Sequence, residues 1–503
     1  MSRWLPAATA LAYLTTVAIL ARGLIRALPW DTDVAAPLVL AERLRGVGDV
    51  SIGHFGSWSV MWALLATRGL PGHRELWSAI GYVFCLLGAG AVGWATARVG
   101  GRWAGVTAFA IAVVVGPYAL RSQLTVIMHV IPPFTAALLA AYLVSLMQFE
   151  SRRSTLIAIP VGLVAGVNAA SDALSWLTAV APFAIAAALL YATTRRTVVA
   201  VSAGITVGTT VLAAVTTALV MRALGYNVVG LSLEHANLGA LPGNLRHLAR
   251  MVALLGGANY ALPGGYPAEP LRIVVALLAA IGVAAAVVCA VQQFRRRSSP
   301  LQRAYACYWA ASVVLLGLSF VLTMNAVALG AGSANYLLTF APAAGAGVGL
   351  LASTSSRGRL AAAVGIAVIG VTNLVGIAQG HADTNLGAIG RYKSRIVAVL
   401  EREGAERGYA GYWDAQNLTW QSHMRLLVAP VVPCADKLCP FNFSTIEGWY
   451  REKSGPTFLI VDPTNGVIGT APPFARRASA RYHFGPLTVY VFRYDIARHI
   501  ATD

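Results

Sequence analysis

Long apolar runs alternate with short polar segments along most of the chain, and this pattern predicts a bundle of membrane-spanning helices. A helix needs about 20 mostly apolar residues to cross a bilayer, and the sequence offers about eleven such runs. The first extends from near Leu5 to Leu28. The others lie near residues 76–97, 103–120, 130–148, 155–170, 175–193, 198–221, 271–292, 304–326, 336–352 and 360–379. The expected fold is therefore mainly α, a polytopic transmembrane helical bundle.

The pattern changes after residue 379, where short mixed segments replace the long apolar runs. Residues 391–402 have the spacing of an amphipathic helix. Three β-branched or apolar runs bounded by Pro and Gly predict strands at 426–429, 457–461 and 488–492. We therefore expect a transmembrane domain at 1–379 and a small C-terminal α/β domain at 380–503.

Composition and charge support the membrane assignment and orient it. The 503 residues are 57% hydrophobic and only 12% charged, whereas soluble domains carry about 25% charged residues. The net charge of +18 comes from short arginine clusters between the apolar runs. The clusters are Arg98 with Arg102, Arg152 with Arg153, Arg195 with Arg196, Arg295 to Arg297 with Arg303, and Arg357 with Arg359.

Basic clusters of this kind hold short loops in the cytoplasm. With Arg3 inside, an odd number of spans places the N-terminus in the cytoplasm and the tail outside. The basic residues form no continuous stripe, which argues against nucleic-acid binding. The expected location is the inner membrane of a bacterium, with membrane lipid as the surrounding partner.

The first outer loop, residues 31–74, carries the strongest candidate site. Asp31 and Asp33 stand in Trp30-Asp31-Thr32-Asp33, directly after the first span. Two carboxylates there can act as a general base or hold a divalent cation against a phosphate. The alternative is that Asp33 caps the apolar helix that follows and Asp31 is a solvated loop acid. The residues alone leave both interpretations open.

The order of motifs in this loop resembles the GT-C glycosyltransferases. The acidic pair is followed by a helix ending Ala41-Glu42-Arg43-Leu44 and then a Gly-aromatic turn. The resemblance is closest to bacterial enzymes with a dolichyl- or polyprenyl-phosphate-sugar donor, of the dolichyl-phosphate-mannose-protein mannosyltransferase kind. It implies that Asp33 or Asp31 is the catalytic base or metal contact, with Asp33 favoured because it borders the helix. His54 stands where relatives carry a Gln, which makes it a candidate substrate-binding residue.

Later loops fit the same resemblance. Arg121 and His129 resemble the second external loop of these enzymes, which implies contact with the donor phosphate. The alternatives are a snorkelling interfacial Arg121 and a His129 that caps a helix end. Asp172 and Tyr336 match a Ser-Asp turn and a Tyr-Leu motif of relatives, which makes both candidate substrate-binding residues. Asn335 stands where relatives frequently have Arg.

Other polar residues carry weaker signals. Glu234 and His235 in the loop 222–270 are further candidates without a specific motif. Cys434 and Cys439 lie close together, and an oxidising compartment would let them form a disulfide; a zinc site would need a second ligand pair. The Tyr and Trp residues of 409–413 can stack on sugar faces or pack in a core, and we favour the core.

Together these features predict an inverting membrane glycosyltransferase, with Asp as the general base. It would transfer a sugar from a polyprenyl-phosphate donor to a cell-envelope glycan or glycolipid acceptor. No cofactor is certain, although a divalent cation at Asp31 and Asp33 stays open. The alternatives are a transporter or flippase of a lipid-linked glycan, and a non-catalytic envelope assembly protein.

Overall fold

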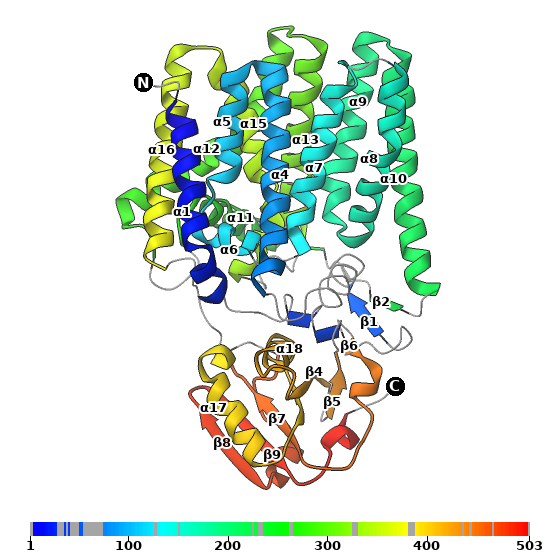
Figure 1. Cartoon of the computed structure of the whole chain (residues 1–503), viewed down its shortest axis with the longest axis vertical. Helices are drawn as coiled ribbons and strands as arrows, with labels where there is room; N and C mark the ends of the chain where they lie inside the picture. The colour runs from blue at the N-terminus through cyan, green and yellow to red at the C-terminus, as the bar shows by residue number, and fades with distance from the viewer. Residues whose placement is uncertain are drawn as a thin grey trace. The chain divides into compact units, whose positions relative to one another are not determined.

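The computed structural model forms two compact units (Figure 1). It describes residues 4–27, 35–36, 39–40, 50–53, 74–124, 128–148, 151–223, 226–229, 235–260, 265–323, 330–380, 388–434, 437–441, 445–464 and 467–500. The first unit comprises Met1–Arg26, Arg74–Thr217 and Ser232–Ala382. The second comprises Ala27–His73, Ala218–Leu231 and Asp383–Asp503, so its residues come from three separate parts of the chain.

The first unit is a helix bundle. Its long helices are α1 (Leu5–Ala27), α4 (Arg74–Gly100), α8 (Ser151–Ser171), α10 (Thr197–Ala223), α12 (Glu269–Arg295), α13 (Pro300–Leu322) and α16 (Ser356–Ala378). Shorter helices are α5 (Arg102–Val113), α6 (Pro117–Leu124), α7 (Ile131–Ser145), α9 (Ala181–Thr194), α11 (Leu241–Gly256) and α15 (Phe340–Ser353). They are connected by short helical elements: η1 (Met128–Val130), η2 (Trp176–Val180), η3 (Leu238–Ala240) and η4 (Gly330–Leu337).

The predicted multi-span helical bundle is confirmed. Among the described residues, eight helices are long and apolar enough to cross a membrane, or up to ten if each of two bent helix pairs is one span. The helix Ile131–Ser145 is apolar but shorter. The count of eleven spans stays a prediction.

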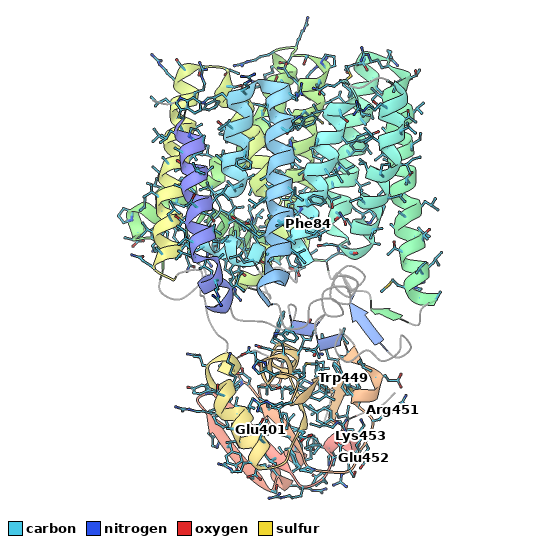
Figure 2. The ribbon with its side chains drawn as sticks, in the orientation of Figure 1. Phe84, Glu401, Trp449, Arg451, Glu452 and Lys453 are labelled. Atoms are coloured by element: carbon cyan, nitrogen blue, oxygen red, sulfur yellow. A yellow bond between two sulfur atoms is a disulfide. The ribbon has the colours of Figure 1, made fainter. Side chains whose placement is uncertain are left out.

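Small residues let the helices of the bundle approach closely. A Cβ added at Gly166 of α8 would lie 2.4 Å from the Thr210 carbonyl oxygen of α10, and one at Gly345 of α15 would lie 2.6 Å from that of Ala108. Phe84 of α4 (Figure 2) packs edge-on against Phe134 of α7, with ring centroids 5.0 Å apart. Lipid supplies no hydrophobic force between helices, so such close packing holds a membrane bundle together.

The apolar run predicted at 103–120 is two helices rather than one, because α5 and α6 meet at a bend of 81°. Backbone groups freed at such a break need new partners inside a bilayer. The Gly116 N–H donates to the Leu255 carbonyl (2.8 Å) and the Tyr13 hydroxyl donates to the Val115 carbonyl (2.9 Å). Pro117 begins α6, where its missing N–H costs nothing. The bend is thus a satisfied, built-in feature of the bundle.

The second unit contains the predicted small C-terminal α/β region, while the boundary at residue 380 stays a prediction. Its six-stranded sheet has the order β5-β4-β3-β7-β9-β8. The strands are β3 (Arg407–Ala410), β4 (Leu427–Cys434), β5 (Lys437–Pro440), β7 (Thr457–Val461), β8 (Ala480–Phe484) and β9 (Leu487–Phe492). β3 runs parallel to β4 and β7, and the other pairs are antiparallel. A disulfide joins Cys434 to Cys439 across the β4–β5 hairpin.

Two cores cover opposite faces of this sheet, because successive strand residues point to opposite sides. On one face, α17 (Ala388–Arg402) and α18 (Tyr412–Gln421) pack over Phe458 and Val489. On the other face, Tyr409, Leu459 and Phe492 pack with residues from far away in the sequence.

Those distant residues are Val39, Leu40 and Met221, all members of the second core. Val39 and Leu40 are each 0% exposed. A small sheet adds to this connection: β1 (Val50–Gly53) pairs with β2 (Tyr226–Val229) and with β6 (Thr445–Ile446). The first long loop is therefore built into the same unit as the tail.

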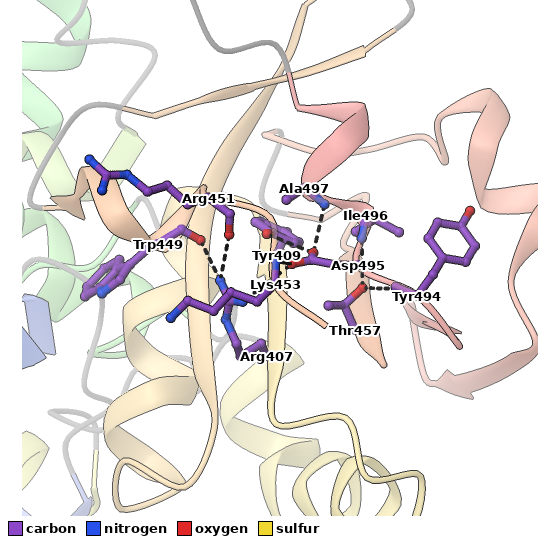
Figure 3. Close-up of polar contacts among 10 residues, drawn as sticks. All are labelled: Arg407, Tyr409, Trp449, Arg451, Lys453, Thr457, Tyr494, Asp495, Ile496 and Ala497. Atoms are coloured by element: carbon purple, nitrogen blue, oxygen red, sulfur yellow. Dashed lines mark hydrogen bonds and ion pairs between the residues drawn. The ribbon is translucent and has the colours of Figure 1, made fainter. Parts of the chain in front are cut away.

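Asp495 is the polar centre of the second unit (Figure 3). Its carboxylate accepts hydrogen bonds from the Lys453 N–H (2.8 Å) and the Ala497 N–H (2.9 Å). The Arg407 guanidinium and the Tyr409 hydroxyl approach it at 3.4 Å each. Because the Asp495 side chain is 1% exposed, these partners replace the water that a charged carboxylate needs.

Candidate active site

A buried histidine–aspartate pair lies in the first unit. The His129 Nδ1 is 2.8 Å from the Asp172 Oδ2, and the two residues are 7% and 1% exposed. The other carboxylate oxygen accepts the Leu174 N–H at 3.0 Å. A carboxylate only accepts hydrogen bonds, so Nδ1 is the donor and the imidazole is held in one tautomer.

Local sequence explains where the two partners lie. Asp172 directly follows α8. Its N–H donates to the Asn168 carbonyl (2.9 Å), which continues the last turn of the helix. His129 is in η1, between the bent helix α6 and α7. The bend after α5 brings α6 and η1 to the same part of the bundle as the end of α8.

A third segment, η4, completes the cluster. The Tyr336 ring meets the His129 ring edge-on, with centroids 4.4 Å apart. The neighbouring Asn335 accepts a hydrogen bond from the Ser122 hydroxyl of α6. Arg121 precedes Ser122 on the same helix. The structure thus brings the predicted residues His129, Asp172 and Tyr336 together.

The helix α11 adds residues that the sequence analysis missed. His247 of α11 lies with its Nε2 2.8 Å from the Ser333 hydroxyl of η4, and its ring stacks on Phe320 with centroids 5.9 Å apart. A signal was present: apolar residues recur at helical spacing from 241 to 255, with Asn237 capping η3 just ahead. In Figure 1, α6 and α11 lie at the lower end of the first unit and α1 begins at its upper end.

Other predicted site residues fall outside the described residues. They are Asp31, Asp33, His54 and Glu234. His235 is described and pairs with Thr323 in an isolated antiparallel bridge. Within the described ranges, no group of three or more His, Cys, Asp or Glu side chains is placed to hold a metal ion; Asp31 and Asp33 lie outside those ranges.

An apolar cavity of about 500 Å³ lies in the same unit. Residues of α5, α11, α12, α15 and α16 line it, and the lining contains no charged side chain. Val114 and Val115, at the bend between α5 and α6, form part of its wall. The cavity has the chemistry of a site for a hydrocarbon chain.

No family model matches this sequence, and neither does any curated protein. Solved structures do match. ArnT from Cupriavidus metallidurans in the apo state has a TM-score of 0.51 at 13% identity, covering 99% of this chain and 100% of that chain. ArnT bound to undecaprenyl phosphate has a TM-score of 0.54 at 12% identity, covering 97% and 99%.

The apo oligosaccharyltransferase of Archaeoglobus fulgidus also matches, with a TM-score of 0.51 at 13% identity. That match covers 85% of this chain and 64% of the other chain. At such identities the likeness shows a shared fold, and with ArnT it extends over nearly the whole of both chains.

Proposed function

We propose that this chain, which has the GT-C fold, is a glycosyltransferase that uses a polyprenyl-phosphate sugar as donor and a cell-envelope glycan or glycolipid as acceptor. One observation carries the proposal: the fold matches ArnT from end to end, including a structure of ArnT bound to undecaprenyl phosphate. Three features of the chain support the use of such a donor.

First, the donor tail has a place to bind. The cavity of about 500 Å³ is lined by apolar residues and glycines and is bounded by five helices of the bundle. A polyprenyl chain has no polar groups, so burying it there needs no hydrogen-bond partner. The wall formed by Val114 and Val115 brings this cavity to the start of α6.

Second, Arg121 and His129 would meet the phosphate of such a lipid. Arg121 presents a guanidinium, which can grip two phosphate oxygens at once. Asp172 orients the His129 ring, because its carboxylate accepts the Nδ1 proton. His129 would contact a phosphate oxygen of the donor through Nε2. Tyr336 covers one side of the ring.

Third, the acidic pair of the first loop supplies the base. The acceptor hydroxyl oxygen attacks the anomeric carbon and its proton passes to Asp33 or Asp31. The bond between that carbon and the phosphate oxygen breaks, and polyprenyl phosphate leaves with the electron pair. A single displacement inverts the anomeric configuration. A divalent cation at the pair would stabilise the leaving phosphate, and His54 would contact the acceptor.

The proposed orientation follows the arginine clusters. Arg98, Arg195 and Arg295 lie at or directly after the ends of α4, α9 and α12, and basic loops stay in the cytoplasm. The N-terminus is then cytoplasmic and the tail extracytoplasmic, in a bacterial plasma membrane. Only lipid-linked sugars are presented on that outer side, which agrees with the proposed donor.

The test is a transfer assay with the full chain in vesicles. A panel of radiolabelled polyprenyl-phosphate sugars is supplied with envelope glycans. Transfer by the wild type, and none by Asp31→Asn/Asp33→Asn, is the expected result, with Glu447→Gln as a matched control at an exposed acid. Movement of a lipid-linked glycan across the vesicle without transfer would instead identify a flippase. Full activity of the double variant would refute the mechanism.

A further inference from the structure

Three separate segments of the second unit bring basic side chains to one place. They are β5, η6 (Pro473–Arg477) and η7 (Ile496–His499). The Phe474 ring of η6 stacks on His499, with centroids 4.5 Å apart and planes 8° from parallel. A parallel bridge between Leu438 and Ile500 sets β5 alongside the end of η7. Lys437, Arg477, Arg498 and His499 thereby form one basic patch.

The charge of the basic patch is not balanced by nearby acids in the described structure. No ion pair links Lys437, Arg477 or Arg498 to a carboxylate among the described residues, and all three side chains are exposed. Asp495, two residues before Ala497, is buried and bound to Arg407 instead. Burial and the charges of Arg498, Arg477 and Lys437 together lower the pKa of His499. The concentrated positive potential is the kind that attracts an anion.

Unused hydrogen-bonding capacity lies beside these charges. The His499 Nε2 and the Tyr494 hydroxyl are buried and lack a hydrogen-bond partner among the described residues. The two rings lie 6.2 Å apart, and the Arg498 guanidinium sits 3.9 Å from the Tyr494 ring centroid. Buried polar groups are nearly always paired in native proteins. Two unmet groups at one cationic, aromatic place therefore indicate a ligand site.

The surface around the basic patch favours a water-soluble polyanion over a bilayer. The large hydrophobic side chains that are exposed all precede residue 376, and none lies in the described part of the tail, 388–500. A surface that inserts into lipid needs such side chains. Exposed cations suit an acidic sugar chain, because they can bond its phosphate or carboxylate groups.

We propose that the basic patch binds an anionic glycan through its phosphate or carboxylate groups. It follows, on the premise of the proposed function, that the acceptor of the transferred sugar is an acidic envelope glycan rather than a neutral one. The second unit then selects the acceptor by charge.

The test measures binding to the full chain in nanodiscs of uncharged lipid, without donor. The probe is a fluorescently labelled oligogalacturonate, and a labelled maltooligosaccharide of equal length is the neutral comparison. We expect the acidic probe alone to bind, and to bind more weakly as salt rises. In Arg477→Gln/Arg498→Gln the affinity should fall about tenfold, since each lost charge-assisted hydrogen bond removes affinity.

A matched control removes the same charge elsewhere. Arg391→Gln/Arg395→Gln changes two exposed arginines of α17, which covers the opposite face of the sheet, and should keep wild-type affinity. Equal losses in both variants, equal binding of the neutral probe, or absence of binding would each overturn the proposal. So would displacement of the probe by phosphatidylglycerol vesicles, which would assign the patch to lipid.

The binding and transfer results separate the two proposals. Asp31→Asn/Asp33→Asn should bind the acidic probe normally while transferring nothing. Binding without transfer from any donor would leave the glycan site standing and remove the proposed function. Normal transfer to neutral acceptors by Arg477→Gln/Arg498→Gln would leave the proposed function standing and remove the proposal of an acidic acceptor.

Discussion

The His129 imidazole and the Asp172 carboxylate are in contact although 43 positions separate them in the sequence. Their hydrogen bond of 2.8 Å is almost completely shielded from solvent. A buried carboxylate of this kind fixes both the tautomer and the direction of an imidazole. The pair therefore behaves as a unit, and its chemistry should depend on both members.

Changing Asp172→Asn should lower kcat/KM for the donor by about tenfold to hundredfold, because a hydrogen bond to a charged group contributes about 1.5–3 kcal/mol. The steady-state rate of sugar transfer measures this.

A double-mutant cycle with His129→Gln supplies the control. If the two residues act together, the double variant should be little worse than either single variant. If the losses in kcat/KM of the two single variants multiply in the double variant, Asp172 and His129 act independently.

Replacing Gly116→Ala should destabilise the bend between α5 and α6 by about 1–3 kcal/mol, the usual cost of overpacking. The added Cβ would lie 2.5 Å from the Gly257 nitrogen, and backbone cannot move aside cheaply. Thermal unfolding in detergent measures the loss. Gly204→Ala on α10 is the control, because nothing lies within 4 Å of its new Cβ; an equally large loss there would contradict the steric argument.

Asp495→Ala should destabilise the second unit by about 3–5 kcal/mol, the cost of leaving a charged partner buried and unpaired. Arg407, whose side chain is 20% exposed, would lose its carboxylate, and the Lys453 N–H would lose its acceptor. Limited proteolysis and thermal unfolding report the change. The control is Glu447→Gln, which breaks an exposed pair with Arg451 and should leave stability almost unchanged. An equal loss of stability in this control would contradict the argument that burial of Asp495 causes the effect.

Acidification should weaken the second unit through His499. Its pKa in the folded protein lies below the ordinary value of 6.5, so the unfolded chain binds the proton more readily. Stability from this residue is present above about pH 6.5 and declines as the pH falls through and below that value. The decrease in unfolding temperature between neutral and mildly acidic pH should be smaller in His499→Gln. An unchanged pH profile would contradict this.

The sequence predicted the elements of the bundle well and their geometry less well. The apolar runs at 198–221 and 360–379 correspond to α10 and α16 within a few residues, because hydropathy decides which segments enter lipid. The bend at Gly116 was missed, since the run from 103 to 120 is apolar on both sides of it. Gly116-Pro117 marks the position, but the break is satisfied by contacts with α1 and α11, which are distant in the sequence.

In the tail, too, the sequence predicted some elements and missed others. The strand predicted at 457–461 is β7, whose residues are all buried. The central strand β3 was missed because Arg407-Gly408-Tyr409-Ala410 is short and has no β-branched residue. Its place between β4 and β7 comes from the pairing, not from local propensity.

For the site, the sequence named His129, Asp172 and Tyr336 one by one. It did not predict that they touch, because nothing in a local motif records contacts over 43 residues. His247 was missed because its helix lies inside a long connecting segment. The roles of Asp31, Asp33, Arg121 and His54 stay predictions for the assays above.

The burial of Val39, Leu40 and Met221 in the second core limits how this protein can be cut or recombined. A tail excised at residue 383 would lose three apolar partners and expose part of the second core, so it should aggregate when produced alone. A chimaera carrying a foreign tail would need that protein's first loop as well. The loop with the acidic pair and the tail therefore form one structural unit and would have to be exchanged together. Membrane helices interrupt the sequence of this unit twice.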